Sequence, residues 1–119
     1  MQKYTSVVSF LLALGSILGI GVTEAVSVEQ DKGIALYRGH CAACHGMDGG
    51  GSGPKAAGMS PAPTNFRNAT AMRAMPDSQL ERAILAGKPG TAMKGYGTVM
   101  NAQDVATVIK YLRSLSAAQ

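Results

Sequence analysis

The feature that most constrains this chain is a short cluster of sulfur and imidazole side chains, His40-Cys41-Ala42-Ala43-Cys44-His45, which contains the only two cysteines in 119 residues. A disulfide across two intervening residues would close a very small loop and stabilise little. A redox-active pair of the thioredoxin type expects a preceding strand, and no alternating or β-branched run comes before Cys41. Zinc would need four ligands to converge from one short stretch. All three readings are therefore disfavoured.

The cluster also matches the motif Cys-x-x-Cys-His, the attachment sequence for c-type haem. Two thiols three positions apart lie on one side of a helical turn, where each can add to a vinyl group of the porphyrin. The next residue can bring its imidazole to the iron. We therefore expect Cys41 and Cys44 to attach one haem c and His45 to ligate the metal.

The N-terminus has the layout of a secretory signal peptide, with Lys3, an apolar run over 7–22, and small residues at Thr23 and Ala25. Cleavage after Ala25 would leave a domain of residues 26–119 in the periplasm or another exported compartment. The run is longer than a usual signal core and shorter than a membrane span, so an uncleaved anchor on the outer face of the inner membrane stays open. Membrane association is expected only if residues 1–25 are retained.

Three helical patterns follow, separated by glycine-rich loops, and no strand pattern appears. The first is expected from Ser27, in a capping box with Gln30, to about His40. Gly33 inside it suggests the close approach of another element. The buried positions expected on the three helices are Ile34, Tyr37 and Cys41; Leu80, Ile84 and Leu85; and Val105, Val108, Ile109, Leu112 and Leu115.

The second helix is expected from about 77–78, with Ser78 and Glu81 as its capping box, to Gly87. The third is expected from Asn101, with Asp104 three residues later, to about Leu115. Between the first two helices, six glycines in the thirteen residues 46–58 permit tight winding rather than regular structure. Phosphate binding there is disfavoured, because the Gly-Lys-Ser/Thr order is missing and no strand leads in.

With these elements in order, the chain resembles the class I cytochromes c over residues 27–119. The resemblance is carried by the first helix leading into 41–45, the loop HGMDGGGSGP followed by PAPTNF, the methionine in GTAMKGYG, and the last helix ending YLRSL. It implies an all-α fold with three main helices around one covalently bound haem. It also implies that Gly33 faces Tyr111 where the first and last helices cross.

For the site, the resemblance implies that the carbonyl of Pro54 accepts the Nδ1 proton of His45, and that Met93 is the second iron ligand. Lys94 follows this methionine where relatives usually have proline, which removes a backbone constraint and would loosen the loop. Met100 is the next candidate for the ligand, although packing at the start of the last helix already accounts for it.

With His45 and Met93 both bound, the expected function is electron transfer between Fe(II) and Fe(III), by a carrier rather than an enzyme. Two alternatives stay open: a haem subunit of a larger oxidoreductase, and a ligand-binding sensor from which Met93 dissociates. Asp77, Glu81 and Asp104 read as helix caps rather than as a catalytic acid pair.

The net charge of +4 suggests redox partners with an acidic docking surface, contacted by Lys55, Lys88 and Lys94. Nucleic acid is not expected as a partner, because the charge is modest and no basic stripe with interleaved aromatic residues is present.

Overall fold

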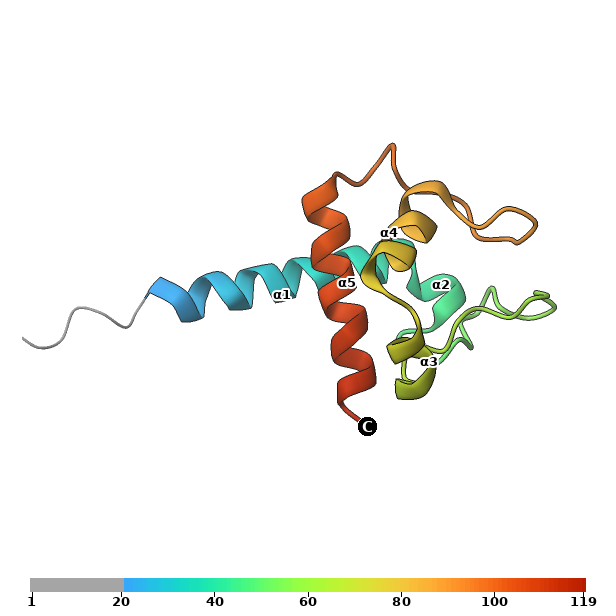
Figure 1. Cartoon of the computed structure of the whole chain (residues 1–119), viewed down its shortest axis with the longest axis horizontal. Coiled ribbons are helices and arrows are strands. Elements are labelled where there is room, and N and C mark those ends of the chain that lie inside the picture. The colour runs from blue at the N-terminus through green and yellow to red at the C-terminus, as the bar shows by residue number, and fades with distance from the viewer. Residues whose placement is uncertain (1–20) are drawn as a thin grey trace, which may run out of the picture.

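The computed structural model describes residues 21–119, and most of the predicted signal peptide lies outside these residues. The described part is helical and contains no strand, only one isolated bridge between Gly87 and Lys94. The expected all-α class is therefore confirmed. The helices, shown in Figure 1, are α1 (Gly21–His40), α2 (Ala42–His45), α3 (Ala69–Ala74), α4 (Asp77–Ala86) and α5 (Ala102–Ala117). None of them is both long and apolar enough to cross a membrane.

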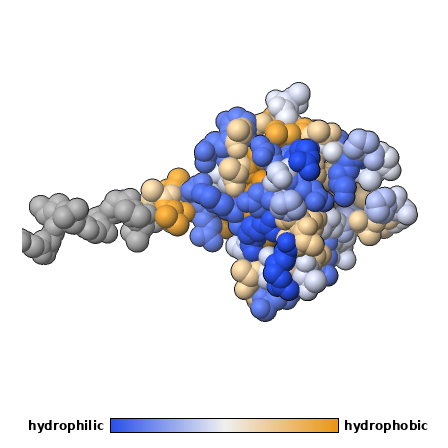
Figure 2. All heavy atoms as spheres, viewed as in Figure 1, coloured by the Kyte–Doolittle hydropathy of each residue, from blue (hydrophilic) through white to orange (hydrophobic). Residues whose placement is uncertain are grey.

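Helix α1 begins earlier than the sequence predicted, at Gly21, and runs without interruption through Ser27 to His40. The predicted cap at Ser27 is wrong. Its hydroxyl instead donates to the carbonyl of Glu24, one turn back, at 2.8 Å, a bond that a serine inside a helix commonly makes. No proline precedes Ser27 to end the helix. The start of α1 extends out of the globule (Figures 1 and 2). Val26 and Val28 on this part of the helix are exposed.

Helices α1 and α5 cross at Gly33, which is buried. A Cβ atom at this position would lie 2.8 Å from the carbonyl oxygen of Thr107, so only glycine allows the two backbones to come so close. The predicted close approach is confirmed, but the predicted partner Tyr111 is wrong. Tyr111 lies one helical turn beyond Thr107 and packs edge-on against Tyr37, with ring centroids 5.1 Å apart.

The two later helices differ in how they begin. At α5 the predicted cap is confirmed, because Asn101 accepts the Asp104 amide at 2.9 Å and Asp104 accepts the Asn101 amide at 3.2 Å. The capping box predicted at Ser78 and Glu81 is wrong. Pro76 is the N-cap of α4 and makes no side-chain cap, so the helix starts before Ser78 could cap it.

Helix α3 was not predicted from the sequence. The side chain of Asn68 caps it by accepting the amide of Ala71 at 3.0 Å. Its one buried side chain, Met72, is 1% exposed and belongs to the core. At six residues α3 is too short for a helical period to show, although Asn68 ahead of good helix formers was a usable signal.

Helix α5 is the centre of the fold, since α1, α3 and α4 each pack against it. Most of the core positions expected from the sequence are buried, whereas Ile34, Cys41, Leu85 and Leu115 are only partly so. The long loop 46–68 and the loop between α4 and α5 extend on the side of the molecule away from the start of α1 (Figure 1). The core consists of Tyr37, Ala42, Phe66, Met72, Leu80, Ile84, Met100, Val105, Val108, Ile109 and Leu112.

Candidate haem-binding site

Cys41, Cys44 and His45 lie within one tight turn at the end of α1. Cys41 is the N-cap of α2, and its carbonyl accepts the amides of Cys44 at 3.2 Å and His45 at 2.9 Å. Neither cysteine is in a disulfide. Burial, with a smaller contribution from Cys44, raises the pKa of the Cys41 thiol to about 11. The turn therefore presents two unpaired sulfur atoms next to an imidazole.

The ring of His45 is held on both its edge and its face. Its Nδ1 lies 3.0 Å from the carbonyl oxygen of Thr64, and Phe66 stacks on it with centroids 4.5 Å apart. Because a carbonyl can only accept, Nδ1 carries the proton of the neutral ring and Nε2 keeps its lone pair. Burial lowers the pKa of His45, against a smaller opposing effect of the Thr64 bond, which favours this neutral form. A metal-ligating histidine needs this second hydrogen bond.

The predicted acceptor for His45, Pro54, is wrong, because the structure gives this role to Thr64. Pro54 is exposed. The residues on either side of it are engaged with α2, where the amides of Gly53 and Lys55 donate to the carbonyls of Cys44 and Ala43 at 3.0 and 2.8 Å. These bonds hold this part of the loop at the backbone of α2, and the chain reaches the imidazole only further on.

The first turn of the loop is fixed to α2 and to the core. The amide of Gly51 donates to the carbonyl of His45 at 2.7 Å, and the buried hydroxyl of Tyr37 donates to the carbonyl of Gly46, also at 2.7 Å. A Cβ atom on Gly53 would lie 2.7 Å from the Ala42 carbonyl oxygen, so the approach requires glycine. The tight winding expected from the glycine content is confirmed, and the surface it winds against is α2.

The loop that carries Met93 is fixed to the end of α4. The amide of Lys88 donates to the Met93 carbonyl at 3.1 Å, and the amides of Tyr96 and Gly97 donate to the carbonyls of residues 84 and 85 at 2.7 and 3.1 Å. The Met93 amide bonds to the hydroxyl of Thr91 at 3.2 Å. The loop is therefore held by backbone bonds, although lysine follows the methionine in place of proline.

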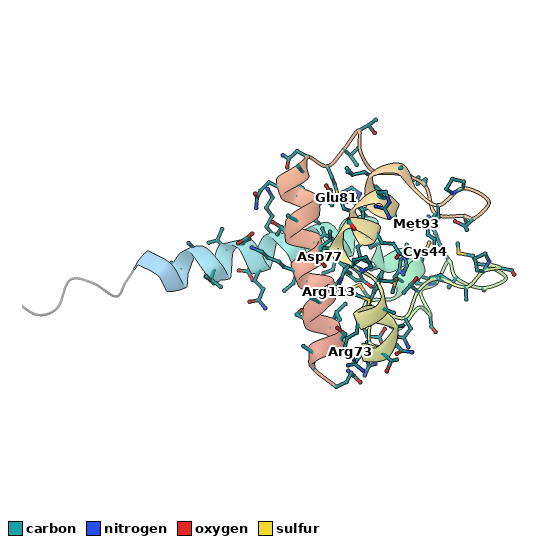
Figure 3. All side chains as sticks on the ribbon, in the orientation of Figure 1. Cys44, Arg73, Asp77, Glu81, Met93 and Arg113 are labelled. Atoms are coloured by element: carbon teal, nitrogen blue, oxygen red, sulfur yellow. The ribbon has the colours of Figure 1, made fainter. Side chains whose placement is uncertain are left out.

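Met93 differs in its surroundings from the other methionines considered. It is partly buried, whereas Met100 and Met72 are core residues with 3% and 1% of their surface exposed. Met47 is 62% exposed and lies two residues from His45. Met93 and Cys44 lie on the same side of α5 in the view of Figure 3. The assignment of Met93 as a ligand stays a prediction, and Met93 suits it better than Met100 because it is not part of the core.

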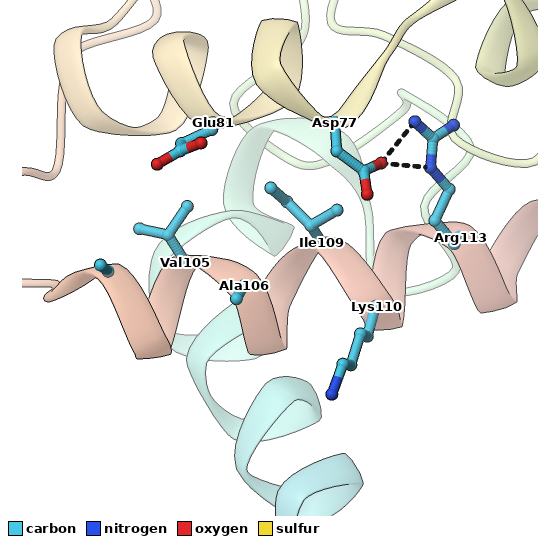
Figure 4. Close-up of a pocket in the computed structure, with 8 residues that line it drawn as sticks. Asp77, Glu81, Val105, Ala106, Ile109, Lys110 and Arg113 are labelled. Atoms are coloured by element: carbon cyan, nitrogen blue, oxygen red, sulfur yellow. Dashed lines mark hydrogen bonds and ion pairs between the residues drawn. The ribbon is translucent and has the colours of Figure 1, made fainter.

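Two of the carboxylates that were expected to cap helices, Asp77 and Glu81, lie next to α5. A cavity of about 400 Å³ between α4 and α5 has Asp77, Glu81 and Arg113 at its edge and Val105 and Ile109 in its wall (Figure 4). Asp77 accepts from Nε and Nη2 of Arg113 at 2.9 and 2.7 Å, as the dashed lines show. The capping roles expected of Asp77 and Glu81 are therefore wrong. None of the predicted haem ligands lines this cavity.

The donor set fits a covalently attached haem. Two unpaired thiols on one turn match the two vinyl groups, and the Thr64 bond orients an imidazole whose Nε2 has no hydrogen-bond partner among residues 21–119. In the same part of the chain, no three His, Cys, Asp or Glu side chains are grouped to hold a bare metal ion. Sequence reasoning missed Thr64 and Phe66 as residues that support His45, although the quoted PAPTNF segment contains both.

Comparison with known proteins agrees with this site. Residues 30–116 match the Cytochrome c family. The chain is 32% identical over 102 residues to dihydro-heme d1 dehydrogenase of Pseudomonas aeruginosa, covering 85% of this chain but only 18% of that protein.

The solved structures similar to this chain include a multiprotein complex and a c-type cytochrome. The reducing HAO-like protein complex Kustc0457/Kustc0458 of Kuenenia stuttgartiensis has a TM-score of 0.61 at 29% identity, covering 74% of this chain and 43% of that one. The KustC0563 c-type cytochrome has a TM-score of 0.58 at 24% identity, covering 70% and 95%, and supports the fold alone. With its helical fold, its Cys-x-x-Cys-His turn and a family match over most of its length, the chain belongs to the cytochrome c family.

Proposed function

We propose that this protein is an electron carrier in which Cys41 and Cys44 attach one haem c, with His45 and Met93 as the axial ligands. The observation that carries the proposal is the His45 ring, which is fixed through Nδ1 and left with Nε2 for a metal. A haem bound in this way supplies one-electron exchange between Fe(II) and Fe(III), and a thioether ligand favours the reduced state.

The protein's part in this function is to hold the two ligands in fixed positions. Thr64 and Phe66 fix the edge and the face of the His45 ring. The bonds from Lys88 and Tyr96 to neighbouring backbone hold the loop of Met93. Because both ligands are held in this way, the arrangement favours a carrier with both axial positions filled over a sensor from which Met93 dissociates.

Replacement of the two candidate methionines tests the ligand assignment. In the purified holoprotein, Met93→Ala should abolish the long-wavelength iron-to-sulfur absorption band of the oxidised form and allow carbon monoxide to bind rapidly to the reduced form. Met100→Ala should keep the band while lowering stability, because Met100 is 3% exposed in the core. Loss of the band in Met100→Ala and not in Met93→Ala would overturn the assignment.

We further propose that Lys55, Lys88 and Lys94 form a docking surface for an acidic redox partner. All three are exposed: Lys55 lies on the loop that follows the cysteine and histidine turn, and Lys88 and Lys94 lie on the loop of Met93. Within residues 21–119 none of these three lysines is in an ion pair, and the same holds for Arg38, Arg73 and Arg82, whereas Lys32, Arg67, Lys110 and Arg113 are paired. Unpaired positive charge at this position would steer association, so the rate of electron exchange with such a partner should fall as salt is added.

We propose that the protein is exported and cleaved after Ala25, and the fold is compatible with this loss. Glu24 and Ala25 are exposed on the extending start of α1. The hydrogen bonds between α1 and α5 begin at Glu29, which pairs with Lys110 at 2.8 Å. The mass of the purified protein tests both the cleavage and the attachment of the haem. We expect one covalent haem and a start at Val26, whereas an intact N-terminus would show an anchor.

A second candidate function is that of a haem subunit in a larger oxidoreductase. Two similarities favour it. The chain is similar to a dehydrogenase, in which the matched region makes up 18% of the length, and to a chain of a multiprotein complex. Gentle purification from the source organism distinguishes the two functions. A carrier elutes alone, whereas a subunit brings a second polypeptide in fixed ratio.

A further inference from the structure

Tyr96 contacts both halves of the haem-binding site. Its hydroxyl donates to the carbonyl of His40 at 2.9 Å, and its ring meets the His40 ring edge-on with centroids 5.6 Å apart. The ammonium group of Lys94, next to Met93, lies 5.5 Å from the centre of the Tyr96 ring. Burial, followed by the nearby Cys41 and Cys44, raises the pKa of Tyr96, so the hydroxyl stays protonated as a donor.

The bond from Tyr96 to His40 has no equivalent elsewhere in the site. Among the described residues it is the only hydrogen bond that joins the Met93 loop, residues 87–100, to the segment 38–66 around the cysteines and His45. Helix α4, to which the Met93 loop is fixed, packs against α5 and against none of the other described helices. Apart from α5, the shared hydrophobic core and a bound haem, Tyr96 is therefore the connection between the two parts that carry the proposed ligands.

The backbone of Tyr96 transmits this connection to the Met93 loop. Its amide donates to the carbonyl of Ile84 at 2.7 Å, and its carbonyl accepts the amides of Val99 and Met100 at 3.0 and 2.9 Å. The side chain thus starts from a fixed point three residues after Met93. If its hydroxyl releases His40, the loop can move away from the cysteine segment without breaking its bonds to α4.

We propose that Tyr96 is a positioning residue which keeps Met93 on the iron by fastening the Met93 loop to the backbone of His40. This inference rests on the proposed ligation by Met93. Tyr96 does not touch the iron in this role: it sets how often the loop opens, and therefore how readily an external ligand replaces the methionine.

Removal of the hydroxyl alone tests the proposal. In holoprotein carrying Tyr96→Phe, carbon monoxide should bind to the reduced form, and imidazole to the oxidised form, about two- to five-fold faster than in the wild type, as expected for one partly exposed hydrogen bond. When the pH is raised, the long-wavelength iron-to-sulfur band of Tyr96→Phe should also disappear at a lower pH than that of the wild type. A purely structural role of Tyr96 would leave the two binding rates unchanged.

Two further variants make the test specific. Tyr111→Phe removes the hydroxyl of another partly buried tyrosine, one that donates no hydrogen bond within residues 21–119, and should bind both ligands at the wild-type rate. His40→Ala removes the ring contact but keeps the backbone acceptor, so it should raise the rates less than Tyr96→Phe. If Tyr96→Phe does not assemble with haem, Tyr96→Leu also lacks the hydroxyl, and wild-type rates in that variant would overturn the proposal.

The proposed function and this inference can fail separately. If Met93→Ala keeps the iron-to-sulfur band, ligation by Met93 is wrong. If Met93→Ala loses the band while Tyr96→Phe binds both ligands at the rates of the wild type and Tyr111→Phe, the role of Tyr96 alone is wrong.

Discussion

The two parts of the molecule that carry the proposed iron ligands, the segment 38–66 and the Met93 loop, are built by different means. Around His45 the protein adds side-chain contacts to the backbone bonds with α2: Phe66 stacks on the ring, and Tyr37, which is fully buried, bonds to Gly46 next to it. Around Met93 it uses backbone bonds to the end of α4 and a single side-chain connection through Tyr96. The side chains that support His45 belong to the hydrophobic core, whereas the Met93 loop lies mostly at its edge, with Met100 as its one buried residue. Substitutions in the first should change stability, and those in the second should change access to the iron.

The largest expected effect is that of Phe66→Ala. Phe66 is 7% exposed and contacts both His45 and Tyr37, so its loss should lower the free energy of unfolding by about 3–5 kcal/mol. Urea unfolding of the holoprotein measures this. Val99→Ala in the Met93 loop is the matched change, and because Val99 is 60% exposed its cost should stay within about 0.5 kcal/mol. Equal losses in the two variants would show that the halves do not differ in this way.

A smaller effect on stability is expected when a tyrosine is changed to phenylalanine, once near His45 and once in the Met93 loop. Tyr37→Phe should cost about 1 kcal/mol of stability, since the Gly46 carbonyl still accepts the Gly49 amide at 3.1 Å. Tyr96→Phe should cost no more than this. Carbon monoxide binding separates the two, because only Tyr96→Phe should accelerate it. Faster binding in Tyr37→Phe would mean that the core half also controls access to the iron.

The smallest expected effect is that of Lys94→Pro, which restores the residue usual in relatives. None of the backbone hydrogen bonds around the Met93 loop uses the Lys94 amide, so proline should stabilise the protein by about 0.4–1 kcal/mol and slow carbon monoxide binding. Lys94→Ala is the control, since it removes the contact with Tyr96 without restricting the backbone. A destabilised Lys94→Pro variant would show that the bridge to Gly87 requires a backbone angle that proline cannot adopt.

The features predicted correctly from the sequence depend on residues that are close together in the chain. The capping pair Asn101 and Asp104 is local, and so is the cysteine and histidine turn. Gly33 correctly indicated a close approach, because the absence of a side chain is itself visible in the sequence. Its partner was not predictable, since the position of the crossing along α5 depends on how both helices pack. Tyr111 was expected there, and Thr107 occupies the position.

The acceptor for His45 could not be identified from the sequence for a different reason. Every residue offers a backbone carbonyl, so the identity of Thr64 gives no sign of this role, and Pro54 was expected by resemblance. The connection from Tyr96 to His40 spans 56 positions and likewise ends on a carbonyl. Such contacts depend on the path of the loops, which the sequence constrains only through its glycines and prolines.

The uninterrupted helix α1 also fixes a direction. It leaves the globule on the side opposite the long loop 46–68 and the Met93 loop (Figure 1). Its 20 residues correspond to about 30 Å of helix. A domain fused to the start of this helix would therefore lie behind the molecule. The side that carries the proposed haem ligands would then face outward, toward partners that arrive from solution.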